Sequence, residues 1–253
     1  MITTNVPGAT RALQALRVLA ATGPMPATHI ARSLGLPRST TYHLLNAMTE
    51  QGFVVHLPEE RRYTLGLAAF EIGTAYTRHG SLQRLARPVL ARLVDGLHES
   101  AHLAVLHGRE VLYLIEERAP GRPPLVTDVG VRLPAQLTAS GRAMLAALPA
   151  AQVRALFADA GAFVQRHEPG PTTLSQLRRV LTRVRAAGVA HEDGEVTPGF
   201  ASVASAVLDP SGHPAAAVAV TFETERVDDA ARLALASAAS RAATTLSRRL
   251  MGR

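Results

Sequence analysis

The residues best suited to catalysis lie at 98–102, where the letters HESAH match the H-E-x-x-H pattern of zinc hydrolases. On one continuous helix this spacing places His98 and His102 on the same face to bind zinc, with Glu99 as the general base. Here the pattern crosses a boundary, because His98 closes a predicted helix and His102 already belongs to an alternating strand. No obvious third ligand follows. We therefore expect structural or solvated histidines, no enzyme activity, no metal and no cofactor, and keep a zinc-dependent hydrolase as an alternative.

A turn of small residues at 138–142, with the sequence TASGR, offers a different kind of chemistry. It leads into the predicted helix RAMLAAL. The first turn of a helix presents free backbone N–H groups and the positive end of the helix dipole. A small carboxylate can bind there without any catalytic residue. Arg142 stands just inside this helix, where it either balances the charge of a ligand or is simply solvated, and we expect it to be solvated.

The stretch GLPRSTTYHLLNAMTEQGF, residues 35–53, begins a predicted helix with a basic residue and a run of hydroxyls. Helical spacing puts polar groups on one face, Ser39, Tyr42, His43 and Asn46, and mostly apolar groups on the other, Thr41, Leu44, Leu45 and Met48. Arg38 and the hydroxyls of Ser39 and Thr40 lie in the first turn, which suits phosphate oxygens. Tyr42 and His43 suit base edges in the major groove. This face is predicted to read DNA.

Two shorter helices precede this one and a hairpin follows it. Residues 10–22 and 27–34 repeat apolar side chains at helical spacing. In the first of these helices the predicted buried face is Ala12, Leu13, Leu16, Leu19 and Ala20. Gly35 ends the second helix, and Pro37 suits the first turn of the third. FVVHL and RYTL are typical of strands around the turn PEERR. This order predicts a helix-turn-helix with a wing.

Three further positions belong to the predicted DNA surface. Arg61 and Arg62 at the hairpin tip are placed to reach the phosphate backbone or the minor groove. Thr28, near the start of the second helix, is placed to contact phosphate. Two alternatives stay open from the pattern alone: an ordinary solvated helix face, and a helix-turn-helix scaffold that binds only protein.

Composition sets the class of protein. The 253 residues are enough for two domains, and 47% of them are hydrophobic, which indicates a globular chain. There is no cysteine, no apolar run long enough to span a membrane and no secretion signal at the N-terminus, so we expect a cytoplasmic protein without membrane contact. The net charge of +7 suits a polyanionic partner, although the arginines that supply it are spread along the chain.

From residue 82 the pattern becomes a mixture of helices and strands. Residues 82–98 are typical of a helix, and AHLAVLHGREVLYLIEE predicts a hairpin that turns at HGRE. Further helices are predicted from SGRAMLAALPAAQVRALFADAG, from LSQLRRVLTRVRAAG and from residues 228–250. FASVASAVL and PAAAVAVTF are typical of strands joined by the turn DPSG. These elements predict an α+β sensor domain of about 170 residues.

The segment between the two parts, LGLAAFEIGTAYTRHG, is typical of a helix with apolar side chains on more than one side. Such a helix either contacts a partner chain or packs only within its own chain.

Several long segments together resemble the isocitrate-lyase-regulator (IclR) family of bacterial transcription factors. ALRVLAATGPMPATHIARSLGLPRSTTYHLLNAMTEQGFVVHLPEERRYTLG resembles its winged-helix domain. LPAQLTASGRAMLAAL, AAGVAHEDGEVTPGFASVASAVLDPSGHPAAAVAVTFE and the closing helix resemble its effector-binding domain. The match runs from about residue 10 to the C-terminus in the order and spacing of the family. It implies an α+β protein with an N-terminal winged helix-turn-helix domain at 1–65, a linker helix at 66–80 and a GAF-like effector-binding domain at 81–253.

The resemblance also implies functional residues. In the family, the turn that matches TASGR binds the effector together with an acidic residue and small polar residues on the following strands. Carried over position by position, the effector-binding residues are Ala139, Ser140, Gly141, Glu192, Ser202, Ala219 and Thr221. Ala219 is apolar where some members have a hydroxyl, which favours a ligand larger or less polar than a two-carbon keto acid. The alternative is that these residues merely pack the sheet.

The family implies a one-component regulator. We expect a repressor that binds a pseudo-palindromic double-stranded operator as a homodimer or a dimer of dimers. A small or aromatic carboxylate is the expected effector. Its binding would favour one arrangement of the linker and the dimer and so change how well two DNA-binding heads fit one operator.

Overall fold

The computed structural model describes residues 6–72, 81–167 and 170–252 and divides into two compact units, Met1–Gly80 and Ser81–Arg253. The finer division at 65 and 66 into a head and a linker helix stays a prediction. Over the described ranges, every helix is too short or too polar to cross a membrane.

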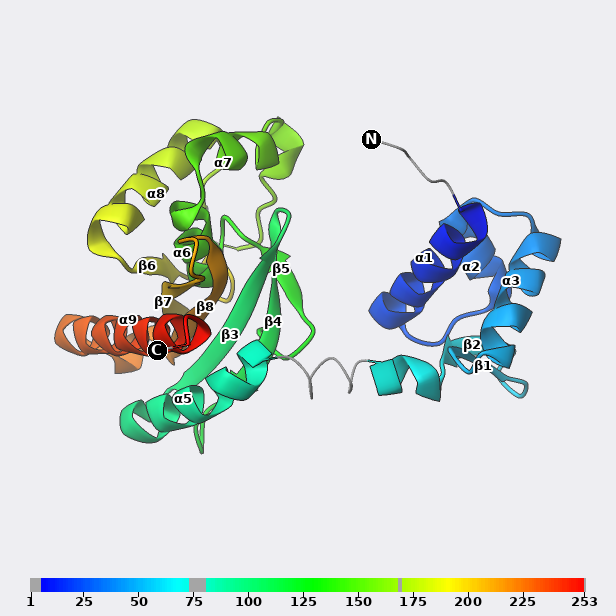
Figure 1. Ribbon diagram of the computed structural model, residues 1–253, viewed down its shortest axis with the longest axis horizontal. Coiled ribbons are helices and arrows are strands. Elements are labelled where there is room, and N and C mark those ends of the chain that lie inside the picture. The colour runs from blue at the N-terminus through cyan, green and yellow to red at the C-terminus, as the bar shows by residue number, and fades with distance from the viewer. Residues whose placement is uncertain (1–5, 73–80, 168–169, 253) are drawn as a thin grey trace. The chain divides into compact units, whose positions relative to one another are not determined.

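The described part of the N-terminal unit begins with three helices and a two-stranded sheet (Figure 1). They are α1 (Pro7–Thr22), α2 (Ala27–Leu34), α3 (Arg38–Glu50) and the antiparallel strands β1 (Val54–Leu57) and β2 (Arg62–Leu65). Their buried side chains form one core, with Ala15, Leu19, Ala27, Ile30, Leu45, Met48, Val54 and Tyr63. The predicted winged helix-turn-helix is confirmed.

The turn between α2 and α3 depends on Gly35. This residue has φ 62° and ψ 36°, a left-handed conformation that glycine adopts without steric cost. Pro37 is the N-cap of α3, so the helix begins one residue later, at Arg38. The buried hydroxyl of Thr41 donates to the carbonyl of Pro37 at 3.0 Å, which satisfies the one polar group on the inward face of the first turn.

The first helix differs from its prediction. It begins at Pro7, three residues earlier, because the fixed φ of proline suits the first turn of a helix. Leu13 was predicted for the buried face and is 62% exposed, and Ala20 is exposed as well. The rest of the predicted face does meet the core: Leu19 is buried and Ala12 and Leu16 are partly buried, and Ala15, four residues before Leu19, is buried beside them.

Residues 67–72 after β2 are helical, which is the described part of the predicted linker helix. A side chain on Gly66 would place its Cβ 2.2 Å from the carbonyl oxygen of Gly52, so only glycine allows the two backbones to cross here. Positions 73–80 of the predicted linker lie outside the described residues.

A six-stranded antiparallel sheet in the order β5-β4-β3-β8-β7-β6 is the centre of the C-terminal unit. Its strands are β3 (Ser100–His107), β4 (Glu110–Glu117), β5 (Arg132–Pro134), β6 (Ala190–Asp193), β7 (Phe200–Leu208) and β8 (Pro214–Glu223). Its α-helices are α5 (Ser81–Leu97), α6 (Ala139–Ala147), α7 (Ala150–Leu156), α8 (Leu174–Ala187) and α9 (Asp229–Leu250).

Helices cover both faces of this sheet (Figure 1). α5 and α9 pack together on one face, and α6 packs on the other with α8 behind it. Alternation along each strand sends side chains to the two faces in turn, so Val218 and Val220 face α5 and α9 while Ala217 and Ala219 face α6. The predicted mixed α+β architecture is confirmed.

Two details of the C-terminal prediction were wrong. The segment 140–161 is not one helix, because Pro149 separates α6 from α7. The short edge strands β5 and β6 were not predicted as strands, and they leave β7 and β8 inside the sheet, β8 beside β3 at its centre. Strands of three and four residues carry too little alternation to stand out in a sequence.

Candidate functional site

The outward face of α3 is polar and open to solvent. The predicted DNA-binding residues Arg38, Ser39, Thr40, Tyr42 and His43 are all exposed, as is Thr28 in the first turn of α2. Tyr42 keeps 48% of its surface accessible although it is aromatic. On the opposite face, Thr41, Leu45 and Met48 are buried. α3 therefore separates an anchoring face from a free polar face, as its spacing predicts.

The wing brings its two arginines to different positions. Arg61 is in the turn and has a positive φ of 53°, whereas Arg62 is the first residue of β2 and pairs with Leu57. The prediction that both lie at the hairpin tip was therefore correct for Arg61 only. Arg62 forms an exposed ion pair with Glu60 at 3.9 Å. Such a pair contributes little to stability, which leaves the guanidinium available to another partner.

In the C-terminal unit, the predicted effector residues come together on the face of the sheet that α6 covers. Glu192 on β6 lies opposite Ser202 on β7, and Ser202 lies opposite Thr221 on β8. A polar row thus crosses three neighbouring strands. Ala219 follows on the same face of β8, where a methyl group in place of a larger side chain leaves space beneath α6.

The first turn of α6 forms the other wall. Thr138 caps the helix, and its buried hydroxyl accepts a hydrogen bond from the N–H of Gly141 at 3.0 Å. The N–H groups of Ala139 and Ser140 belong to the first turn, where a helix offers them no acceptor of its own. Gly141 does not line the cavity. A Cβ on it would lie 2.2 Å from the carbonyl oxygen of Ala135, so glycine lets this turn approach the preceding backbone.

Hydrogen bonding in the row is incomplete. The Ser202 hydroxyl donates to Oε1 of Glu192 at 2.9 Å and shares a 3.0 Å hydrogen bond with the hydroxyl of Thr221. Among the described residues, Oε2 of Glu192 and the hydroxyl of Ser140 are buried and make no hydrogen bond of good geometry, although the Tyr113 hydroxyl is close to Ser140 and the backbone of Val196 is close to Glu192. Buried polar groups in proteins are nearly always paired, so these two atoms indicate a place for a ligand or water.

A cavity of about 10 Å³ lies between these walls. Ala139, Ser140, Glu192, Ser202, Ala219 and Thr221 all line it, and so do Tyr113, Thr127, Thr138 and Val196. A space of this size holds about one water molecule. An effector larger than water must therefore open the cavity.

Tyr113 and Thr127 were missed by the sequence analysis. Tyr113 is a single polar-tipped aromatic residue within the apolar strand β4, and alternation could have placed it on the α6 face. Thr127 lies in an irregular segment, where no periodicity predicts orientation. Its hydroxyl is 2.8 Å from Nε2 of His102, whose ring packs edge-on against Tyr113.

Burial sets the protonation of this region. It raises the pKa of Glu192 to about 8, against the opposing effect of the hydrogen bond from Ser202. The Glu192 side chain is therefore largely protonated and neutral at pH 7. Burial also lowers the pKa of His102 to about 4 and raises that of Tyr113, so both are neutral as well. The cavity wall is thus polar and uncharged.

Arg142 corrects an expectation. We expected a solvated side chain, but it is 4% exposed and each of its three guanidinium nitrogens donates a hydrogen bond. Its guanidinium donates to the carbonyls of Gln136 and His191 at 2.8 and 2.6 Å and to Glu195 at 2.5 Å. It thereby ties the first turns of α6 to the strand that carries Glu192.

The zinc-hydrolase alternative is overturned. α5 ends at Leu97, His98 follows in a left-handed conformation with φ 56°, and His102 is buried in β3. The two histidines do not share a helix face. Glu99 forms a short ion pair with Arg122. The part of the chain that the structure describes holds no group of three His, Cys, Asp or Glu side chains able to hold a metal.

Known protein families match both units. The IclR helix-turn-helix domain matches residues 8–58, and the family "Bacterial transcriptional regulator IclR C-terminal" matches residues 74–248. The chain is 33% identical to the glycerol operon regulatory protein of Streptomyces coelicolor, with 88% of this chain and 87% of that protein covered. It is 29% identical to the acetate operon repressor of Salmonella typhimurium, with 90% and 84% covered. These relatives are transcriptional regulators and not enzymes.

A solved structure shares the fold. The chain resembles an IclR homolog from Microbacterium hydrocarbonoxydans, in a complex with 4-hydroxybenzoate, with a TM-score of 0.82 and 21% identity over 97% of this chain and all of that one.

Proposed function

Because this chain belongs to the IclR family of bacterial transcriptional regulators, we propose that it is a repressor whose operator binding is controlled by a small carboxylate bound beneath α6. The observation that carries the proposal is the polar cavity itself, in which Oε2 of Glu192 and the hydroxyl of Ser140 are buried and unpaired. If these residues only packed the sheet, two buried polar atoms would lack hydrogen-bond partners, and this loss would lower the stability of the fold with no gain in function.

The cavity wall supports a carboxylate that also carries a neutral polar group. The N–H groups of Ala139 and Ser140 suit the carboxylate, since the helix dipole favours negative charge there. Protonated Glu192 does not repel an anion and can donate a hydrogen bond to it. Tyr113 adds an aromatic wall. A relative of the same fold binds 4-hydroxybenzoate, and we extend that class of ligand, a hydroxylated aromatic acid, to this chain.

The exposed face of α3 is the proposed reader of DNA. Arg38, Ser39 and Thr40 bind phosphate and fix the register, and Tyr42 and His43 discriminate between bases. Thr28, Arg61 and Arg62 contact the backbone beside the major groove. A protein with this partner acts where the chromosome is, which in a bacterium is the cytoplasm.

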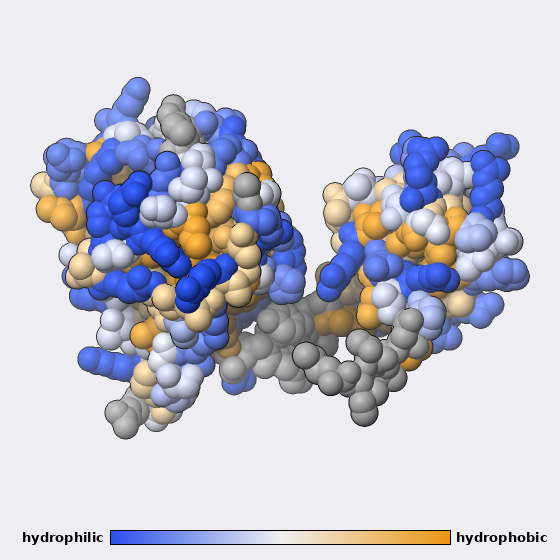
Figure 2. Space-filling model, turned by 90° about the horizontal axis from the view of Figure 1, so that it is seen from above, coloured by the Kyte–Doolittle hydropathy of each residue, from blue (hydrophilic) through white to orange (hydrophobic). Residues whose placement is uncertain are grey.

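Exposed apolar residues support a homodimer, with a dimer of dimers as its possible extension. Leu13 on α1 is 62% exposed, and Leu67 and Ile72 after the wing are 67% and 59% exposed. Figure 2 shows hydrophobic residues gathered among hydrophilic ones on the visible face of the N-terminal unit. Large apolar side chains in water favour association, and a two-fold dimer presents two α3 helices to a pseudo-palindromic operator.

The proposed switch is a shift in population. An effector that widens the cavity favours one arrangement of α6 and the sheet, and the dimer transmits this preference to the spacing of the two heads.

The test combines operator selection with ligand release. The full-length protein is used to select its operator from random double-stranded DNA, and binding is then followed while 4-hydroxybenzoate and other small carboxylates are added. Ser202→Ala should weaken the response to the active carboxylate about tenfold, since it removes a hydroxyl of the row. Ser205→Ala is the matched control, because Ser205 is on the same strand but bonds to the carbonyl of Gly188 outside the cavity.

Selection of no DNA sequence would contradict the regulator proposal. A carboxylate that releases DNA equally well from both serine variants would contradict the placement of the effector site.

A further inference from the structure

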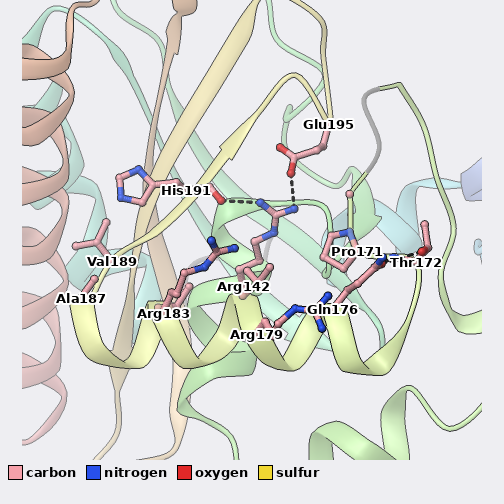
Figure 3. A pocket seen from close by; sticks show the side chains of 13 residues that line it. Arg142, Pro171, Thr172, Gln176, Arg179, Arg183, Ala187, Val189, His191 and Glu195 are labelled. Atoms are coloured by element: carbon pink, nitrogen blue, oxygen red, sulfur yellow. Dashed lines mark hydrogen bonds and ion pairs between the residues drawn. The ribbon is translucent and has the colours of Figure 1, made fainter.

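A groove of about 840 Å³ lies outside the effector cavity, between α8, β6 and residues 170–172 (Figure 3). Its lining residues come from α8, from the edge of the sheet, from the loop before α8 and from α6, among them Arg142, Thr172, Gln176, Arg179, Arg183 and Glu195. It shares no lining residue with the effector cavity.

Positive charge dominates this groove. Figure 3 shows Arg183 extending from α8 towards Arg142, which is held between Glu195 and the carbonyl of His191, while the side chain of Arg179 runs along α8 towards Gln176. Glu195 is the one acidic residue of the lining, and Arg142 already neutralises it. Asp193, two residues before Glu195, pairs with Arg232 at 2.9 Å.

Two arginines in the groove lack a counter-charge. Within the described ranges, neither Arg179 nor Arg183 forms an ion pair, and the only hydrogen bond of Arg179 is to the hydroxyl of Ser175 at 3.3 Å. They are four residues apart on one helix, so their Cβ atoms lie about 6 Å from each other. α8 contains four arginines and no acidic residue, which raises the positive potential further.

The backbone of the edge strand excludes one kind of occupant. β6 has a free edge, and such an edge can accept an added strand from a peptide. Here Arg142 takes the outward carbonyl of His191, and Glu195 accepts from the outward N–H of Asp193 at 2.5 Å. Because these outward backbone groups of β6 are already hydrogen-bonded, a peptide cannot add to the sheet as a further strand here. A ligand of the groove would therefore bind to its side chains.

We propose that this groove is a second ligand site, which takes a small polyanion with two or more acidic groups held by Arg179 and Arg183. Guanidinium groups bind carboxylate and phosphate through paired hydrogen bonds. Arg142 and Glu195 form a neutral pair at the floor, so the unbalanced positive charge is that of Arg179 and Arg183, and Gln176 and Thr172 supply neutral hydrogen-bonding groups. The site is open to solvent and large enough for such a ligand without opening, unlike the effector cavity.

Binding of defined probes tests the proposal. Citrate and inorganic pyrophosphate are titrated into the full-length protein by calorimetry at low ionic strength, with acetate as the monovalent comparison. We expect both polyanions to bind with one site per chain and acetate not to bind measurably. The double variant Arg179→Gln, Arg183→Gln should weaken polyanion binding at least tenfold. If only one of the two probes binds, the result assigns the acidic group as carboxylate or phosphate.

Arg178→Gln is the matched control, because Arg178 is exposed on the same helix and does not line the groove. It should leave polyanion binding within twofold of the wild type. Equal weakening in this control would mean that the ion responds to the diffuse charge of α8, and no binding to the wild type would mean that the groove holds no such site. Either result overturns the proposal. Melting temperatures check that the exposed substitutions leave the fold intact.

Discussion

The outward face of α3 and the polar row beneath α6 differ in how strongly the structure indicates that they bind a ligand. The outward face of α3 presents Arg38, Tyr42 and His43 to solvent, where water satisfies every hydrogen bond. The row on the sheet buries Glu192 and Thr221 and half-buries Ser202 beneath α6, where protein atoms or a ligand must supply most of the hydrogen bonds. The first surface is compatible with DNA, with another protein or with water alone. The second contains unpaired atoms that a ligand would satisfy.

The difference is one of free energy. An exposed polar side chain costs nothing when it has no partner, whereas a buried one without a partner costs about 1–3 kcal/mol. A protein that keeps such a group needs a reason to do so. The buried row is therefore a stronger structural indication of binding than the exposed face, although the exposed face was the easier one to predict from sequence.

The largest expected effect concerns the buried carboxyl. Burial raises the pKa of Glu192 from its ordinary 4.5 to about 8, so the folded protein binds a proton that the unfolded chain has lost between these values. Its contribution to stability is present below about pH 4.5 and is lost as the pH rises towards 8. Glu192→Gln should therefore become more stable than the wild type at high pH, by several kcal/mol at about 1.4 kcal/mol for each pKa unit.

Urea unfolding at pH 5, 7 and 9 measures this difference. Glu225→Gln, on an exposed side chain, is the control and should follow the wild type. If the difference in unfolding free energy between Glu192→Gln and the wild type stays constant with pH, Glu192 is already ionised in the folded protein. The row on the sheet would then be solvated like the outward face of α3.

Close backbone packing beneath the effector site gives the next effect. Gly141→Ala forces a Cβ against the backbone of Ala135 and should cost about 3 kcal/mol of unfolding free energy. Gly96→Ala is the matched control, because it lies within α5 with open space around it and should stabilise the helix by about 0.5–1 kcal/mol. Calorimetric melting of both variants decides the point. Similar melting temperatures would mean that the turn before α6 is not tightly packed.

The exposed face of α3 should show its importance only in DNA binding. Arg38→Ala should weaken operator binding about tenfold and reduce the slope of log affinity against log salt by about 1, because one phosphate contact is lost. Tyr42→Ala should instead relax base preference at a cost of about 1–3 kcal/mol. Binding titrations at several salt concentrations separate the two roles. Arg17→Ala on α1 is the exposed control.

A smaller effect is expected for one hydroxyl of the buried row. Thr221→Val keeps the shape but removes the partner of Ser202, and should cost about 1 kcal/mol, or roughly fivefold to tenfold, in affinity for the active carboxylate. Calorimetric titration of the ligand measures it. An unchanged affinity would show that Thr221 only packs the sheet, which was the alternative left open by the sequence.

The smallest effect is predicted for the wing. Arg62→Ala breaks an exposed ion pair with Glu60 and should change the unfolding free energy by less than about 0.5 kcal/mol. A larger loss of unfolding free energy in urea would mean that the side chain of Arg62 contributes to the stability of the wing.

Sequence reasoning worked where periodicity was long and failed where it was short. The three-residue and four-residue edge strands β5 and β6 escaped it, and so did the break at Pro149. Leu13 was placed on the wrong side of α1 because a helix rich in apolar residues offers more than one plausible buried face. Arg142 was expected in water because arginine is rarely buried, and only its three partners from distant segments explain its burial.

The sequence by itself determined the winged helix-turn-helix, the longer helices and strands and the DNA-facing residues, because these follow from local periodicity. The resemblance of long segments to one family added the residues expected at the effector site. Only the tertiary structure decided which of those residues meet. Glu192, Ser202 and Thr221 become neighbours through strand register, and Tyr113 and Thr127 join them from segments far away in sequence. Burial, unpaired atoms and shifted pKa values arise from that assembly, since desolvation depends on everything that surrounds a side chain.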